Sequence, residues 1–265
     1  MTAQARSTDV ASATAGARDA HSASVAAGAA RRGVDWIAVL AALAVIGVFV
    51  RAMLFTPLEL RQGAAHKILY IHAPAAWVAF LAFFLVALAG GLYLWLRDER
   101  LDRFAASSAE VGLIFTTVVL ITGPIWARPI WWTWWTWDAR LTSTLFLWFI
   151  YLGYLVLRGA IDDRRMRARY SAILGILGSL LIPFIHMSVY LFRTLHPLPV
   201  LASPEAITGL ASGDPARRTM TPEMLTTLLL AIAAFTLLYV AFVRVRYRLA
   251  EAQDAFDALG ARGSD

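Results

Sequence analysis

Two histidines and a run of tryptophans are the residues of this chain whose types suit the binding of a large planar ligand. Residues 131–137 place five of the ten tryptophans on seven positions. Flat indole rings suit either the membrane–water interface or the face of a planar ligand. His72 and His196 each lie at one end of a long apolar stretch, and imidazole is a frequent ligand of transition metals.

The composition indicates that these residues are positioned by membrane-spanning helices. The chain is 59% hydrophobic and 16% charged, with a mean hydropathy of +0.62, whereas soluble domains carry about 25% charged residues. Six apolar runs approach or exceed the roughly 20 residues that cross a bilayer as a helix. We expect an all-α, polytopic membrane protein with the tryptophans in a loop between its third and fourth helices. The expected spans are residues 36–55, 68–96, 105–126, 141–157, 170–192 and 224–243.

The distribution of basic residues predicts how these spans are oriented. With both termini in the cytoplasm, 16 of the 24 Lys and Arg residues lie on the cytoplasmic side, as the positive-inside rule favours. We expect a disordered cytoplasmic tail at 1–32, a membrane domain at 33–248 and a cytoplasmic C-terminal tail at 249–265. The tryptophans would then face the periplasm of a bacterial inner membrane. The net charge of +6 is interpreted as anchoring to membrane lipid, with no nucleic-acid partner.

Haem is the ligand that this set of side chains fits. His72 and His196 are the predicted axial ligands of its iron. The outer-side arginines Arg128, Arg140 and Arg193 are candidates to neutralise its propionates. Because the chain has no cysteine, it cannot form a thioether, so we expect haem b to be bound non-covalently and transiently. The remaining candidate binding residues are Trp131, Trp132, Trp134, Trp135, Trp137 and Asp138.

The tryptophan segment leaves two interpretations open. A helix would place only Trp131, Trp134 and Trp135 on one face, so a smooth helix cannot present all five indoles. Either the segment is irregular, or some indoles belong to an interfacial aromatic belt. Asp138, just before the next apolar run, is expected to cap that helix at its N-terminus.

Three further ionisable residues, His186, His66 and Glu110, lie in or next to the expected spans. His186 lies near Pro183 inside the fifth span, where either a structural role or a role around the iron ligands is open. His66, beside Lys67, is expected to be a solvated loop residue. Glu110 is expected to pair with Arg103 or with a neighbouring loop arginine.

The motif Trp134-Trp135-Thr136-Trp137-Asp138, continued by Ala139-Arg140-Leu141, resembles the tryptophan-rich WWD motif of the haem-handling membrane proteins of cytochrome c maturation. The resemblance is to the short six-span member, component C (CcmC), and it covers the chain after about residue 32. The two periplasmic haem-ligand histidines of that family correspond to His72 and His196. Trp132 departs from the family pattern, which has a small residue there.

The resemblance implies haem handover in cytochrome c biogenesis by a membrane subunit of an ABC-type haem exporter. The implied partners are a periplasmic haem chaperone, a small single-span subunit, a second permease-like subunit and a cytoplasmic ATPase. The chain has no Gly-x-x-x-x-Gly-Lys-Ser/Thr loop, so ATP hydrolysis is expected of a partner. The sequence shows no group of residues that could act together as nucleophile, base and orienting residue, so we do not expect an enzyme. The alternatives are a haem electron carrier of the b type and a transporter with an aromatic belt.

Overall fold

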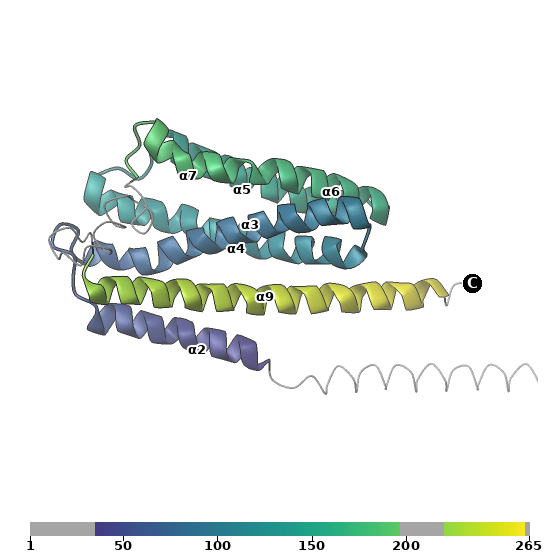
Figure 1. Cartoon of the computed structure of the whole chain (residues 1–265), viewed down its shortest axis with the longest axis horizontal. Coiled ribbons are helices and arrows are strands. Elements are labelled where there is room, and N and C mark those ends of the chain that lie inside the picture. The colour runs from purple at the N-terminus through teal and green to yellow at the C-terminus, as the bar shows by residue number, and fades with distance from the viewer. Residues whose placement is uncertain (1–34, 197–219, 263–265) are drawn as a thin grey trace, which may run out of the picture. The chain divides into compact units, whose positions relative to one another are not determined.

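The computed structural model describes residues 35–196 and 220–262, which are mostly helical (Figure 1). Six of their helical stretches are long and apolar enough to cross a membrane. This confirms the prediction of an all-α, polytopic membrane protein. The elements are α2 (Trp36–Val50), continued by the π-helical turn η1 (Arg51–Phe55), the 3-10 turn η2 (Ala64–Ile68), α3 (Leu69–Leu96), α4 (Glu99–Trp131), α5 (Ala139–Ala160), α6 (Arg164–Ser179), α7 (Leu181–Leu191) and α9 (Pro222–Arg262).

Several boundaries differ from those predicted from hydropathy. The third span continues to Trp131, so the first tryptophan of the run still belongs to α4. The fifth span is divided into α6 and α7 at Leu180, because Pro183 has no N–H to donate to the carbonyl of Ser179. The boundary expected after residue 248 falls inside α9. The tail expected at residues 1–32 lies outside the described residues.

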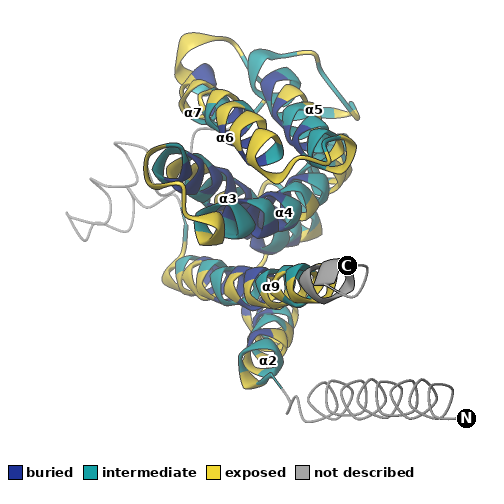
Figure 2. Cartoon of the chain, turned by 90° about the vertical axis from the view of Figure 1, so that its right-hand side faces the viewer, coloured by how far each residue is buried: buried dark blue, intermediate teal, exposed yellow. Residues whose placement is uncertain are grey.

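Helices α3 and α4 form the centre of the bundle, with α5, α6 and α7 on one side and α9 on the other (Figure 2). The core between α3, α4 and α9 is built from small and aromatic side chains, among them Ala82, Phe115 and Tyr239. A Cβ atom at Gly112 of α4 would come within 2.7 Å of the Phe83 ring. Close approach of these helices therefore depends on small residues, as is usual where lipid leaves van der Waals packing to hold helices together.

Bidentate ion pairs join the helices at the end of the bundle where α4 begins. Arg158 of α5 donates to both carboxylate oxygens of Asp102, at 2.6 and 2.9 Å. Glu110 accepts from Arg246 of α9, with a nitrogen–oxygen distance of 2.7 Å. Its partner is therefore Arg246, whereas Arg103 pairs with Asp254 at 2.9 Å. We call the opposite end of the bundle, which carries residues 131–137, the tryptophan end.

The expectation that His66 is a solvated loop residue is wrong. His66 and Lys67 lie in η2 and are 6% and 8% exposed. The ammonium of Lys67 donates to three backbone carbonyls, those of Ala52, Thr56 and Pro57. These carbonyls belong to η1 and the residues after it, where the helix has ended and its own N–H groups no longer reach them. Lys67 thereby ties the end of the first span to the start of α3.

Candidate functional site

The tryptophan segment is irregular, as one of the two interpretations predicted. Helix α4 ends at Trp131, and Trp132 adopts a left-handed backbone with φ of 58°. Its amide donates to the carbonyl of Arg128 at 3.1 Å. Within the following turn the Thr133 hydroxyl donates to the carbonyl of Trp135 at 3.1 Å. The helix therefore ends at the left-handed residue Trp132, and residues 133–138 follow a non-helical course to the start of α5.

Asp138 fixes the other end of this segment. One oxygen of its carboxylate accepts from the amides of Arg140 and Leu141, both at 3.0 Å. This confirms the predicted N-cap of α5. The second oxygen accepts from the hydroxyl of Thr136 at 2.9 Å. One carboxylate thus starts α5 and holds the last turn of the tryptophan segment against it.

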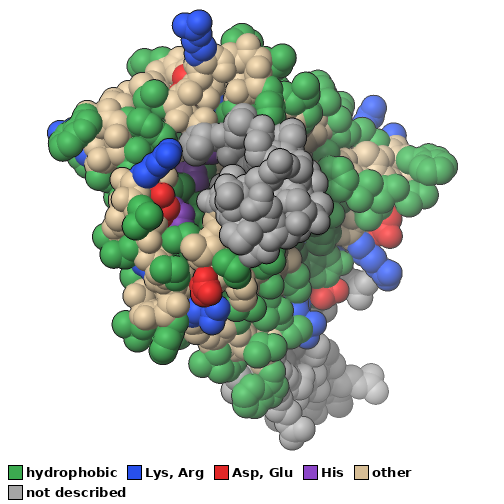
Figure 3. Space-filling view, turned by 60° about the vertical axis from the view of Figure 1, so that its left-hand side comes forward, with side chains coloured by type: hydrophobic (Ala, Val, Ile, Leu, Met, Phe, Trp, Pro, Cys, Tyr) green, Lys and Arg blue, Asp and Glu red, His purple; other side chains and the backbone are tan. Residues whose placement is uncertain are grey.

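A cavity of about 330 Å³ lies beneath the tryptophan segment. Figure 3 shows histidine side chains within a recess at this end of the molecule. The volume falls at the lower end of the range of roughly 300 to 1,000 Å³ that is usual for ligand sites. Its walls come from α3, α4, α5, α7 and α9 and from the tryptophan segment, and they are mostly apolar. Besides the two histidines, the predicted binding residues that line this cavity are Trp131, Trp134, Trp135 and Arg140.

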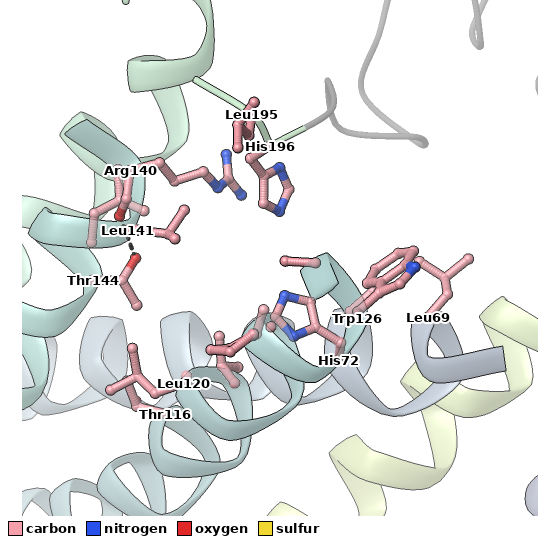
Figure 4. A pocket seen from close by; sticks show the side chains of 18 of the residues that line it. Leu69, His72, Thr116, Leu120, Trp126, Arg140, Leu141, Thr144, Leu195 and His196 are labelled. Carbon is pink, nitrogen blue, oxygen red and sulfur yellow. Dashed lines mark hydrogen bonds between the residues drawn. The ribbon is translucent and has the colours of Figure 1, made fainter. Parts of the chain in front are cut away.

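His72 and His196 are brought together in this cavity although 124 positions separate their residue numbers. Their ring centres lie 6.4 Å apart, with the ring planes inclined by 36°. Figure 4 shows the two imidazoles pointing toward each other, His72 from the first turn of α3 and His196 from the residues after α7. The structure therefore places the two predicted iron ligands on opposite sides of one space.

His72 is held by three residues of α4. Its Nδ1 lies 2.9 Å from the hydroxyl oxygen of Thr122. The ring of Trp126 meets the imidazole edge-on at 5.8 Å, and the Trp126 indole donates to Gln62 at 2.9 Å. A Cβ atom at Gly123 would lie 3.3 Å from Cε1 of His72. The imidazole is thus confined by a hydrogen bond, an aromatic edge and a close backbone contact.

The three candidate propionate partners occupy different positions. Arg140 lines the cavity, and its Nη1 is buried without a hydrogen-bond partner among the described residues. Arg128 instead donates to the carbonyl of Trp132 at 2.8 Å, and its guanidinium lies 5.7 Å from the centre of that indole. Arg193 is exposed. Neither Arg128 nor Arg193 belongs to the cavity wall.

The indoles divide into two groups. Trp131, Trp134 and Trp135 line the cavity, whereas Trp132 and Trp137 do not. Trp132 and Trp137 are 79% and 77% exposed. Trp137 meets Trp135 edge-on at 5.8 Å, so the exposed group is continuous with the cavity wall.

Sequence reasoning missed several residues of the wall. The cavity is also lined by Trp77 of α3 and by Gly123 and Trp126 of α4. Thr122, also on α4, contacts His72. Their spacing on α4 offered a weak signal, because residues 122 and 126 share one helical face. His186 of α7, for which the sequence left a structural role or a role around the iron ligands open, also lines the cavity. The structure therefore places a third imidazole in the wall, beside the side chains that surround the predicted ligands.

Comparison with known proteins identifies the family of this chain. Residues 18–259 match the family model described as heme exporter protein C. A heme exporter protein C of Bradyrhizobium diazoefficiens is 36% identical over 211 residues, which cover 79% of this chain and 75% of the relative. That of Haemophilus influenzae is 36% identical over 208 residues, covering 78% and 80%. That of Escherichia coli is 34% identical over 163 residues, covering 62% and 66%. With a family model matched over most of its length, the chain belongs to the heme exporter protein C family.

Proposed function

We propose that this protein binds haem non-covalently in the cavity at the tryptophan end and hands it over during cytochrome c biogenesis. The observation that carries the proposal is the pair of imidazoles, His72 and His196, that face each other across the cavity. The names of the relatives, which describe haem export, support the same cargo. Haem is the cargo of this site and not a resident cofactor.

The spacing of the two rings matches axial coordination. An imidazole nitrogen lies about 2.0 to 2.1 Å from a bound transition metal, and the ring centre is about 1.1 Å further, so two opposite ligands have centres about 6.3 Å apart. The observed separation is 6.4 Å. The separation of the ring centres therefore leaves room for an iron ion between His72 and His196.

The wall residues suit the remaining parts of haem b. Trp131, Trp134 and Trp135 offer aromatic surface to the macrocycle. Arg140 Nη1 and the Trp135 indole nitrogen are both buried without a partner among the described residues, and leaving such donors unpaired is costly. A propionate carboxylate would accept from these donors, and we assign Arg140 as its principal cation. Arg128 and Arg193 lie outside the cavity wall, and we assign neither of them to a propionate.

We propose that haem is released readily, because the protein has no cysteine to bind it covalently. The chain contains no cysteine, so no thioether attaches the cargo and its departure breaks only iron–nitrogen bonds and non-covalent contacts. The exposed indoles of Trp132 and Trp137 give a partner an aromatic surface beside the bound haem, and Asp138 holds that surface in place. We propose that a periplasmic haem chaperone docks there, with the termini in the cytoplasm of a bacterial inner membrane.

The rest of the complex is assigned from the family. By resemblance to that family, a small single-span subunit, a second permease-like subunit and a cytoplasmic ATPase are the proposed partners. ATP hydrolysis is assigned to the ATPase, because this sequence has no phosphate-binding loop of its own. The subunit itself is proposed to act in transport and assembly, and not as an enzyme.

The test is an absorption spectrum of the purified protein, oxidised and reduced, with His72→Ala and His196→Ala variants. Wild type should show low-spin haem with two imidazole ligands, and each variant should change the spectrum and block transfer of haem to an apo-acceptor. His21→Ala, in the N-terminal segment, is the control. Unchanged spectra in both cavity variants would refute the assignment. Haem that resists transfer from the wild type would favour an electron carrier.

A further inference from the structure

Thr122 links His72 to the backbone of α4 through a short chain of hydrogen bonds. Its hydroxyl oxygen lies 2.9 Å from Nδ1 of His72 and 2.7 Å from the carbonyl oxygen of Val118. A carbonyl oxygen can only accept, and a threonine hydroxyl carries a single proton. At 2.7 Å two oxygens need that proton between them, so Thr122 donates to Val118, as threonines inside helices often do.

The direction of this first bond determines the second. With its proton committed to Val118, the Thr122 oxygen is left as an acceptor, so the partner must be an N–H on Nδ1 of His72. A neutral imidazole with its proton on Nδ1 carries its lone pair on Nε2. In Figure 4 the His72 ring points toward His196, with its Nδ1 held on the side of α4. Nε2 is therefore the nitrogen that can bind a metal between the two rings.

Two neighbours of Thr122 hold the ring in the same orientation. Gly123 allows the backbone of α4 to approach the imidazole, since a Cβ atom there would be 3.3 Å from Cε1. Trp126 closes the ring from another side, at 5.8 Å between ring centres. The hydrogen bond thus acts on a ring that has little freedom to rotate away from it.

We propose that Thr122 is a positioning residue for iron coordination, which fixes His72 in the tautomer that presents Nε2 to the haem iron. This rests on the proposed function, because it takes His72 as an axial ligand. Donation of the second ring N–H to an oxygen also makes the imidazole a stronger ligand, and loss of such a partner typically lowers metal affinity about 10- to 100-fold.

The test compares Thr122→Val, which keeps the shape of the side chain and removes the hydroxyl, with Thr122→Ser, which restores the acceptor. Thr122→Val should weaken haem binding about 10- to 100-fold, and Thr122→Ser should recover most of it. The reduction potential of bound haem should also rise in Thr122→Val, because a weaker imidazole donor stabilises ferric iron less. A tenfold loss confined to ferric haem corresponds to about 59 mV for one electron.

Thr226→Val is the matched control. Thr226 is exposed, and its hydroxyl donates to the carbonyl of Pro222 four residues earlier, at 2.7 Å. It therefore makes the same kind of hydrogen bond within its helix as Thr122 does, but it is not bonded to His72. Its removal should change neither the affinity nor the potential. Wild-type affinity and potential in Thr122→Val would overturn the role of Thr122. Absence of haem binding in the wild type would instead refute the proposed function.

A ligand-replacement experiment tests the same bond without relying on one variant. In His72→Gly, added imidazole can coordinate iron and still donate an N–H to Thr122, whereas 1-methylimidazole has no N–H. Imidazole should therefore restore the low-spin spectrum at about tenfold lower concentration. The preference should disappear in His72→Gly/Thr122→Val, while a purely steric preference would persist there and overturn the proposal.

Discussion

Arg140 is the arginine of the cavity wall whose removal should act on the carboxylates of haem. Its Nη1 is buried in the cavity region without a partner among the described residues. A hydrogen bond to a charged group contributes about 1.5 to 3 kcal/mol. Arg140→Gln also relieves the cost of burying Nη1 without a hydrogen-bond partner among the described residues of the haem-free protein. We therefore expect the lower part of that range, which corresponds to a loss of roughly tenfold in haem affinity.

The assay is a titration of the detergent-purified protein with haem and, separately, with haem dimethyl ester, whose propionates carry no charge. Wild type should bind haem more tightly than the ester. Arg140→Gln should lose affinity for haem and bind the ester as the wild type does. Arg128→Gln should weaken both ligands alike, because Arg128 acts on the backbone of Trp132 and not on the cavity. Arg193→Gln, at an exposed position, should change neither.

Two results would refute this reasoning. An equal loss of both ligands in Arg140→Gln would show that the guanidinium supports the cavity wall and does not contact a carboxylate. A selective loss of haem that is as large in Arg193→Gln would mean that general positive charge attracts the haem, without a defined propionate site.

Three further predictions concern the parts that surround the site. Asp138→Ala removes the cap of α5 and the hydrogen bond to Thr136, so it should lower the free energy of unfolding by about 0.5 to 2 kcal/mol. It should slow transfer of haem to an apo-acceptor more than it weakens haem binding. Equal effects on transfer and binding would contradict the capping argument. Trp135→Ala should increase haem dissociation severalfold, since a stacked ring contributes about 0.5 to 1.5 kcal/mol, whereas Trp132→Ala should affect only handover; stopped-flow transfer to an acceptor distinguishes the two. Asp102→Ala leaves Arg158, whose side chain is 15% exposed, without its bidentate partner. It should destabilise the bundle by less than the about 3 to 5 kcal/mol of a fully buried pair, seen as a lower melting temperature in detergent with an unchanged haem spectrum; a melting temperature equal to that of the wild type would contradict it.

The features predicted correctly from sequence are those governed by local chemistry. The six spans follow from apolar runs long enough for a bilayer, a property of consecutive residues. The cap at Asp138 follows from one acidic side chain placed before an apolar run. The 3.6-residue period excludes a smooth helix that places all five indoles of residues 131–137 on one face. Of the two interpretations left open, the structure shows the irregular course.

The features that sequence could not decide depend on how separate helices meet. Hydropathy does not show that Lys67 reaches the carbonyls at the end of the preceding span. The prediction that the neighbouring His66 is a solvated loop residue is therefore wrong. Three arginines near the tryptophans have the same charge in the sequence. Only the packing of α5 against the cavity brings Arg140 into its wall, while the turn at Trp132 engages Arg128.

The site itself shows the same division. The sequence singled out His72 and His196 by residue type and by their expected side of the membrane. Their ring separation of 6.4 Å is a product of tertiary structure, because it requires α3 and the residues after α7 to converge at one end of the bundle. The contact of Thr122 with His72 likewise joins residues 50 positions apart on two helices. Residue chemistry determined what this protein can bind, and helix packing decided which atoms are available to bind it, since a hydrogen bond or a metal ligand requires positions set to a fraction of an ångström.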